Sequence, residues 1–445
     1  MRRTGDTIIF TYFSRHAECG NLLIEAQLNA VFISPHAYAT YHLNIIRYTN
    51  NPINQEKKMP TGLFALALGA FGIGLTEFGI VGLLPQIAAE FNVTEQVAGY
   101  LVSGYAISVA IGAILLTAVM IRMERRLTLL LLSGLFIVGN LISALSTSYE
   151  TLLLGRIVAA LCHGAFFSVG AVVASDMVAG DKKGAAISLM FAGLTVSNIV
   201  GVPLGTFVGL ELGWRTTFWA LAIIGFITIV GIRTLIPVMP AHRDTNLGRE
   251  FAVFNRPQVW VSALLSVLSF GGVIGGFTYI AFTLTQVSGF TAQMVPWLLV
   301  LFGVGTFVGN IYGGKAADKS LNKSLGTILL LLTVVMAAFA LSAQNQIMTV
   351  ILLLMMGTVG LATAPGLQLR MMKYASDAPT VASGTNIAAF NIGNALGAWL
   401  GGMALDKGYG FVSPLWVGAL LSLIALMVVI LGSFNGGLKT SQIKG

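Results

Sequence analysis

Six apolar segments of this chain are followed by six more that repeat them. From about residue 61 onward the sequence is a series of apolar stretches of about 20 residues, the length that crosses a ~30 Å hydrocarbon core. Five positions of the first set return in the second at an offset of 196 residues: Asn198, Gly201, Gly205, Gly164 and Gly170 match Asn394, Gly397, Gly401, Gly360 and Gly366. The repeat predicts an all-α membrane protein with twelve transmembrane helices in two pseudo-symmetric six-helix halves. Such repeats are typical of transporters in which one half rocks against the other.

The composition excludes a soluble domain and several classes of site. Hydrophobic residues make up 56% of the chain and charged residues only 9%, whereas soluble domains carry roughly 25% charged residues. The net charge of +8 is spread over short loops without interleaved aromatic residues, so nucleic-acid binding is not expected. Cys19 and Cys162 are the only cysteines, which leaves no disulfide framework and no zinc-type spacing. We therefore expect neither a metal nor a cofactor.

The apolar stretches set the expected spans and domains. The spans run roughly over 62–84, 96–120, 127–147, 151–175, 185–210, 216–237, 259–286, 292–313, 324–343, 347–371, 381–405 and 411–433. These spans place an N-terminal half at 59–237, a linker at 238–257, a C-terminal half at 258–435 and a cytoplasmic tail at 436–445.

The first 58 residues differ from the rest of the chain. They are richer in His, Asn and Tyr, show no sustained period, and lack the pattern of a signal peptide. Met59 follows two lysines and opens directly onto the first apolar span. Our interpretation is that Met59 is the natural start and that residues 1–58 are a non-native extension. The alternative is a disordered cytoplasmic tail.

Lys and Arg residues gather in alternate loops. One set of loops holds thirteen of them, and the opposite set holds only Arg215 and Lys407. The thirteen are Arg122, Arg125, Arg126, Lys182, Lys183, Arg243, Arg249, Arg256, Lys315, Lys319, Lys323, Arg370 and Lys373. Because basic loops remain in the cytoplasm, both termini and the linker are expected on the cytoplasmic side.

Glu77 is the one acidic residue after Met59 that lies well inside a span. An ionisable group at such a depth is costly and faces a cavity or a partner. Glu77 lies ~22 Å from the cytoplasmic start of the first span, and Arg156 lies ~8 Å from the outer start of the fourth. In a ~30 Å core these depths coincide, so an ion pair between Glu77 and Arg156 is geometrically allowed.

Two roles are open for this pair. Burial favours the neutral acid and a nearby guanidinium favours the carboxylate, so Glu77 could carry a proton as the cavity opens to one side or the other. The alternative is a static ion pair that holds the first span to the fourth. His163 follows Arg156 by seven residues and lies on nearly the same helix face. Its role is to line the cavity or to relay protons, or else it is a histidine hydrogen-bonded inside the bundle.

The fifth span combines regularly spaced glycines with a proline. Gly193, Gly201, Gly205 and Pro203 form a motif in which the glycines allow close helix approach and the proline permits a bend. The repeat in the eleventh span replaces Pro203 with Trp399. This asymmetry favours a special role for the fifth span beyond ordinary packing.

Amide and tyrosine side chains in apolar spans are candidates for substrate contact. They either bind a polar substrate or bond neighbouring helices to one another. The candidates are Asn198, Asn386, Asn391, Asn394, Gln368, Tyr105 and Tyr279.

Three stretches resemble motifs of the major facilitator superfamily. The first span reads LGAFGIGLTEF over 68–78, the fourth reads GRIVAALCHGAFF over 155–167, and the fifth contains Gly-x-Pro-x-Gly over 201–205. Residues 59–435 are similar to this superfamily, and most similar to its bacterial drug:proton antiporter-type branch. The resemblance implies the major facilitator fold, a monomer in the bacterial inner membrane, and an antiporter motif in the fifth span.

One motif departs from the superfamily pattern. The loop between the second and third spans, IRMERR over 121–126, lacks the glycine and aspartate of the cytoplasmic latch. The second-half copy of this loop matches the superfamily pattern more closely, with Gly314, Asp318 and Lys319. Glu124 or this second copy could take the place of the first, and Arg122 stands at the repeat offset from Asp318.

These observations favour an exporter of a small organic solute, driven by proton antiport through alternating access. The resemblance implies a sugar-like metabolite, a nucleoside or a drug as the substrate. The alternative is an uncoupled facilitator or an importer of the same solutes. An enzyme is disfavoured because only His163 and His242 remain as histidines after Met59 and no nucleophile and base converge. A channel is disfavoured by the repeat and by the lack of a filter-like segment.

Overall fold

The computed structural model describes residues 59–120, 123–178, 182–239, 252–376 and 379–441. The proposed extension at 1–58, most of the predicted linker, Arg122 and the last four residues of the predicted tail lie outside this part. Every helix discussed below lies in one compact unit, Met59–Gly445.

The first half of this unit forms six membrane-length helical segments. They are α4 (Gly62–Phe78) continued by η3 (Gly79–Leu83) and α5 (Leu84–Phe91), α6 (Glu95–Met120), α7 (Arg125–Ala144), α8 (Tyr149–Asp176), α9 (Lys183–Val196) continued by η5 (Ser197–Gly201) and α10 (Val202–Leu212), and α11 (Trp214–Leu235).

The second half forms six more after the short η6 (Ala252–Asn255). They are α13 (Pro257–Thr278) continued by α14 (Ile280–Phe282) and η7 (Thr283–Val287), α15 (Val295–Lys319) preceded by η8 (Ala292–Met294), α16 (Leu321–Ser342), α17 (Gln346–Tyr374), α18 (Pro379–Asp406) and α19 (Ser413–Ser441). The predicted all-α fold of twelve membrane helices in two halves is confirmed.

Eleven of the described helices are long and apolar enough to cross a membrane. The twelfth segment, α18, carries Asn386, Asn391 and Asn394 along 28 residues, and these amides lower its hydropathy. Because a polar helix is costly against lipid, α18 is suited to the interior between the halves.

The sequence repeat is also present in the backbone geometry. Leu83 (φ −101°, ψ −8°) and Tyr279 (φ −104°, ψ 13°) stand 196 positions apart and both interrupt the first span of their half. The two halves differ at the fifth and eleventh spans. Ser197–Gly201 forms a single π-helical turn before Pro203, whereas α18 is helical throughout. Pro203 has no N–H to donate, which favours an irregular turn at this point.

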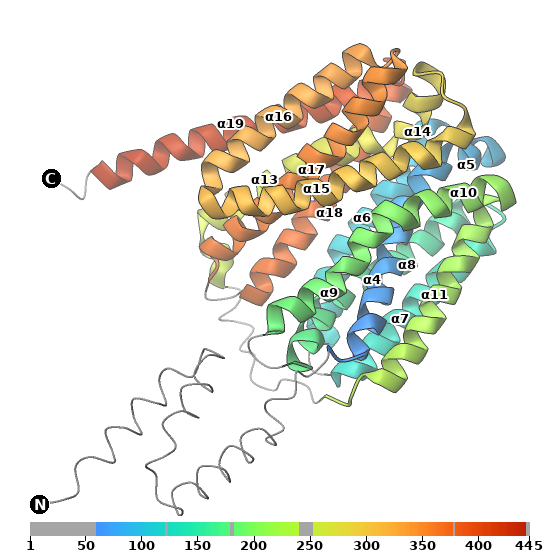
Figure 1. The fold of residues 1–445 in the computed structure, drawn as a ribbon, viewed down its shortest axis with the longest axis vertical. Helices are drawn as coiled ribbons and strands as arrows, with labels where there is room; N and C mark the ends of the chain where they lie inside the picture. The colour runs from blue at the N-terminus through green and yellow to red at the C-terminus, as the bar shows by residue number, and fades with distance from the viewer. Residues whose placement is uncertain (1–58, 121–122, 179–181, 240–251, 377–378, 442–445) are drawn as a thin grey trace, which may run out of the picture. The chain divides into compact units, whose positions relative to one another are not determined.

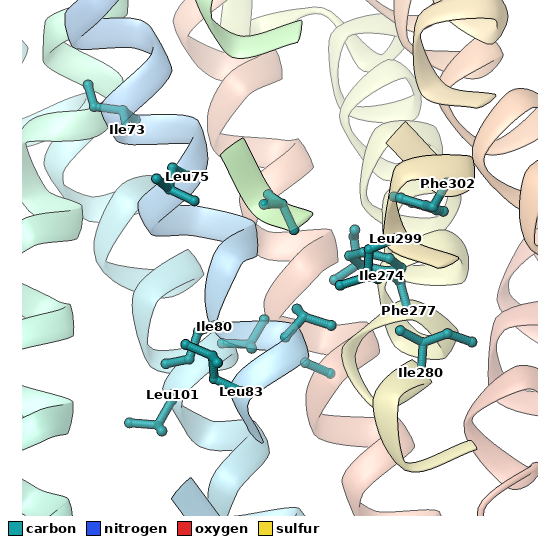
Figure 2. Packing of buried hydrophobic residues seen from close by; sticks show 14 of the residues in the cluster. Ile73, Leu75, Ile80, Leu83, Leu101, Ile274, Phe277, Ile280, Leu299 and Phe302 are labelled. Carbon is teal, nitrogen blue, oxygen red and sulfur yellow. The ribbon is translucent and has the colours of Figure 1, made fainter. Parts of the chain in front are cut away.

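The two halves pack against each other along two seams. In one seam α6 lies against α18, and in the other α15 lies against η5 and α10. Figure 1 shows the first-half helices, blue to green, grouped beside the second-half helices, yellow to red. One hydrophobic cluster includes residues of both halves, among them Leu83 and Leu101 of the first and Ile274, Phe277 and Ile280 of the second (Figure 2).

We call the end of the bundle that carries the loops before α7, α9 and α16 the basic end. The end that carries α5, α14 and the start of α11 is called the opposite end.

Candidate functional site

The end of α4 creates a polar site in the middle of the bundle. At Phe78 the α-helix α4 changes to the 3-10 turn η3, which interrupts the regular pattern of α-helical backbone hydrogen bonds. Arg156 of α8 donates from Nη1 to the Thr76 carbonyl and from Nε to the Leu101 carbonyl at 3.4 Å. The Arg156 side chain is 1% exposed. A guanidinium at a helix C-terminus is also favoured by the helix dipole.

Glu77 lies beside this contact and reaches across to the other half. Its side chain is half-buried, and its Oε1 accepts a hydrogen bond from Asn394 Nδ2 of α18 at 3.4 Å. No ion pair within 4.0 Å joins Glu77 to Arg156, both of which lie in the described part of the chain. The pair that the sequence allowed is therefore replaced by two neighbouring contacts, Arg156 with Thr76 and Glu77 with Asn394.

Tyr105 and His163 extend the polar site within the first half. The Arg156 guanidinium carbon lies 4.2 Å from the centre of the Tyr105 ring, which is the geometry of a cation–π contact. Tyr105 Oη lies 3.4 Å from His163 Nδ1, and His163 packs against Phe167. The Tyr105 and His163 side chains are both buried.

Three buried polar atoms near Glu77 have no hydrogen-bond partner among the described residues. They are Arg156 Nη2, Asn391 Oδ1 and Asn394 Oδ1. Buried polar groups are almost always paired in native proteins, by protein, water or ligand. Arg156 therefore offers a donor, and Asn391 and Asn394 each offer an acceptor, to water or a polar solute.

Gln368 belongs to a different network, inside the second half. Ser266 Oγ donates to Asn386 Oδ1, Asn386 Nδ2 donates to Gln368 Oε1, both at 2.6 Å, and Gln368 Nε2 donates to Ser383 Oγ at 3.2 Å. These bonds connect α13, α17 and α18. The structure therefore gives Gln368 and Asn386 partners on neighbouring helices.

Two further candidates lie apart from Glu77. Tyr279 is completely buried, and its Oη donates to the Ala398 carbonyl at 2.9 Å towards the opposite end. Asn198 is half-buried within the π turn, where its backbone packs closely against Gly303 of α15. Asn198 thus lies at the second seam between the halves.

The glycine motif of the fifth span forms the surface against which α4 packs. An added Cβ at Gly193 would collide with the Ala67 carbonyl, one at Gly201 would lie 3.0 Å from the Phe71 ring, and one at Gly205 would lie 2.9 Å from Leu75. Ala67, Phe71 and Leu75 are spaced by four residues, so they form one stripe of α4. The motif holds the helix that carries Glu77.

At the basic end, side-chain contacts connect neighbouring helices and loops. Arg125 forms an ion pair with Asp176. Glu124 caps α7 by accepting from the amides of Arg126 and Leu127, and also accepts from the Met239 amide at 3.2 Å. Glu124 therefore ties α7 to the segment after α11.

The second-half copy of the latch motif, at the same end, is less closely packed. Gly314 lies near the basic end of α15, and an added Cβ there would make only an ordinary contact with Pro365. Asp318 and Lys319 are exposed and form no ion pair with a described residue. Arg122, the proposed cross-half partner of Asp318, lies outside the described residues.

Sequence reasoning missed the backbone acceptors of Arg156, which are the Thr76 and Leu101 carbonyls. It also missed Asn140 of α7, whose Oδ1 lies 3.5 Å from Thr76 Oγ1. The glycines at 79 and 82 and Pro85 were the available signal, because such residues mark interruptions of a helix.

Twelve membrane helices in two repeated halves, with a carboxylate at the seam between them, define a membrane transporter of the two-half type. A family model described as Major Facilitator Superfamily matches residues 66–384. The chain belongs to the major facilitator superfamily, as its motifs predicted.

Three relatives support this membership. The inner membrane transport protein YdhP of Escherichia coli K12 is 42% identical over 371 residues, which cover 83% of this chain and 95% of YdhP. The chloramphenicol resistance protein of Streptomyces lividans is 33% identical over 83% of this chain and 95% of its own length. The putative transporter AraJ of E. coli K12 is 30% identical over 83% of this chain and 94% of AraJ. The relatives are named as transport or resistance proteins and not as enzymes.

A solved structure agrees with the fold. The crystal structure of a bacterial homologue of the human lysosomal transporter Spinster, in an inward-facing and occupied conformation, aligns with a TM-score of 0.67 and 17% identity. The alignment covers 83% of this chain and 96% of that one.

Proposed function

We propose that this protein exports a small organic solute in exchange for protons, with Glu77 as the proton carrier. The observation that supports the proposal most directly is the position of Glu77, which is half-buried on α4 and hydrogen-bonded to Asn394 on α18 of the other half. A carboxylate at such a contact changes its surroundings whenever the two halves rock. Protonation and rocking are therefore coupled through one side chain.

Asn394 is suited to form a hydrogen bond with Glu77 in both of its protonation states. Its Nδ2 donates to the carboxylate, while its Oδ1 has no partner among the described residues. An amide carries both donor and acceptor atoms, so Oδ1 can accept from the protonated acid after a rotation of the amide group. In this mechanism Asn394 transmits the change at Glu77 to α18 and hence to the second half.

The solute is expected to bind beside Glu77. Arg156 Nη2, Asn391 Oδ1 and the Tyr105 and His163 rings supply a donor, an acceptor and aromatic surface around it. Such a set suits a sugar-like metabolite, a nucleoside or a polar drug. The resistance name of the S. lividans relative favours a drug-like substrate and outward transport. The alternative is an uncoupled facilitator or importer of the same solutes.

The deciding experiment compares cells that produce the wild type or Glu77→Gln at equal abundance in the membrane. Metabolites in the medium are profiled first, and chloramphenicol, sugars and nucleosides are then added as challenges. A solute enriched outside only with the wild type supports export coupled at Glu77. Equal export by both proteins, unchanged when the pH gradient is collapsed, favours the facilitator.

We also propose a bacterial inner-membrane location, a monomer and cytoplasmic termini. The basic loops before α7, α9 and α16 lie at one end of the bundle, which supports a cytoplasmic basic end. The name of the E. coli relative YdhP supports the inner membrane. Fusions of a periplasm-active and a cytoplasm-active reporter after residue 431 test the orientation.

A further inference from the structure

Tyr279 of the second half is inserted into a notch at the opposite end of the bundle. A Cβ added at Gly99 of α6 would collide with Tyr279 Oη, and so would one added at Gly402 of α18. The hydroxyl is held there by its bond to the Ala398 carbonyl, and the side chain is 0% exposed. Since Gly99 belongs to the first half, this contact crosses the seam.

The local backbone explains why the side chain points across the seam. Tyr279 lies between α13 and α14 with non-helical dihedral angles, and its neighbours Phe277 and Ile280 belong to the hydrophobic cluster in Figure 2. Leu83, the repeat counterpart of Tyr279, packs instead near Gly209 of its own half. Leucine has no hydroxyl, so the hydroxyl contact with a glycine of the other half is a feature that the repeat does not share.

Gly99 is an unfavourable residue for a helix interior unless space is needed. Glycine in a helix is less stable than alanine because it loses more backbone freedom on folding. Gly99 is helical, so its backbone does not require glycine for conformational reasons. The requirement comes from the Tyr279 hydroxyl, which occupies the place of the missing Cβ.

We infer that Tyr279 and the notch formed by Gly99 and Gly402 are a latch that holds the two halves together at the opposite end. When the halves separate at that end, the hydroxyl must leave Gly99 of α6, whereas its bond to Ala398 and its contact with Gly402 lie within its own half and can persist. The strength of this contact therefore sets the balance between the state closed at the opposite end and the state open there. This role differs from the substrate contact that the sequence suggested for Tyr279.

The latch is tested by distance measurements between spin labels on the purified protein in lipid nanodiscs, without substrate or pH gradient. Cys19 and Cys162 are replaced by serine, and Glu211→Cys in α10 and Tyr409→Cys after α18 carry the labels, since both positions are exposed. Gly99→Ala is compared with Gly134→Ala, an equal change at a glycine whose added Cβ would meet nothing within 4 Å. We expect Gly99→Ala to raise the open-to-closed ratio about fivefold or more, because the added methyl group would collide with the Tyr279 hydroxyl while the halves are together at that end. Gly134→Ala is expected to leave it unchanged.

A double-mutant cycle separates the latch from ordinary packing. Tyr279→Ala should favour the open state by itself, and adding Gly99→Ala to it should change the ratio by less than about twofold. Tyr279→Phe keeps the ring but loses the hydroxyl. If Gly99→Ala folds poorly, the open-to-closed ratio of Tyr279→Phe is measured in its place. The inference is wrong if Gly99→Ala behaves like Gly134→Ala, if its effect persists undiminished without Tyr279, or if Tyr279→Phe leaves the ratio unchanged. None of these outcomes depends on proton coupling.

Discussion

Arg156 donates a hydrogen bond to the backbone carbonyl of Thr76, the residue directly before Glu77. A buried arginine is therefore stabilised by a helix end instead of by an acid. The same bond fixes the end of α4 against α8 and places the Glu77 side chain at the seam. The positive charge of Arg156 remains close to Glu77 without neutralising it in a closed ion pair.

Arg156→Lys should reduce transport by about tenfold or more, because one ammonium cannot reach the carbonyls of Thr76 and Leu101 together. Initial rates in proteoliposomes measure the effect per folded molecule. Arg370→Lys is a matched control, since Arg370 is also buried but binds Asn322 in the second half. Equal losses in both variants would contradict a specific role for Arg156.

Asn394→Leu should uncouple transport from the pH gradient, because it removes the Nδ2 donor to Glu77 and the Oδ1 acceptor while nearly keeping the side-chain volume. The measurement is solute efflux from proteoliposomes with and without an imposed gradient. Thr385→Ala on the same helix is the control, because the Thr385 hydroxyl donates to the Val381 carbonyl of its own helix. If Asn394→Leu responds to the gradient as the wild type does, Asn394 has no part in coupling.

Gly193→Ala should destabilise the protein by about 1–3 kcal/mol, because the new methyl group collides with the backbone of α4 at Ala67 and a backbone atom yields little. Thermal unfolding in detergent, followed by tryptophan fluorescence, reports the loss. Gly134→Ala has open space around it and should unfold at the wild-type temperature or slightly above. Equal unfolding temperatures for the two variants would argue against the glycine motif as the packing surface for α4.

Glu124→Ala should cost about 1 kcal/mol, the usual value for losing a helix cap. Glu124→Gln keeps one of the two oxygens that accept from the Arg126 and Leu127 amides, so it should lose less than Glu124→Ala. Thermal unfolding separates the two variants, and transport per folded molecule should stay near the wild-type level. If a Glu124 variant has normal stability but altered transport, the result would favour Glu124 as part of the cytoplasmic latch motif and not as the N-terminal cap of α7.

The repeat of 196 residues was visible in the sequence because glycines and amides are conspicuous against an apolar background. It predicted the twelve helices and the two halves, and the interruptions at Leu83 and Tyr279 follow the same offset. Glu77 and Arg156 were conspicuous for the same reason, since charges are rare inside spans. Their common depth followed from the helix rise per residue.

The partners of these residues depended on the rotation of each helix about its own axis, which an almost uniformly apolar sequence does not encode. The common depth allowed an ion pair between Arg156 and Glu77, and in the structure Arg156 binds the Thr76 carbonyl. Gln368 was a candidate for substrate contact and bonds to Asn386 and Ser383. Depth is a property of one helix, whereas a hydrogen bond needs two helices with matching rotation.

The sequence by itself determined that this chain is a two-half membrane bundle with an acid in its interior, because hydropathy, repeats and rare charges are local properties. Only the tertiary structure decided that Glu77 binds the other half through Asn394 and that Tyr279 is inserted against Gly99. Both contacts join residues from different halves. Such contacts arise from the packing of whole helices, where close approach at glycines and the pairing of buried polar groups select one arrangement.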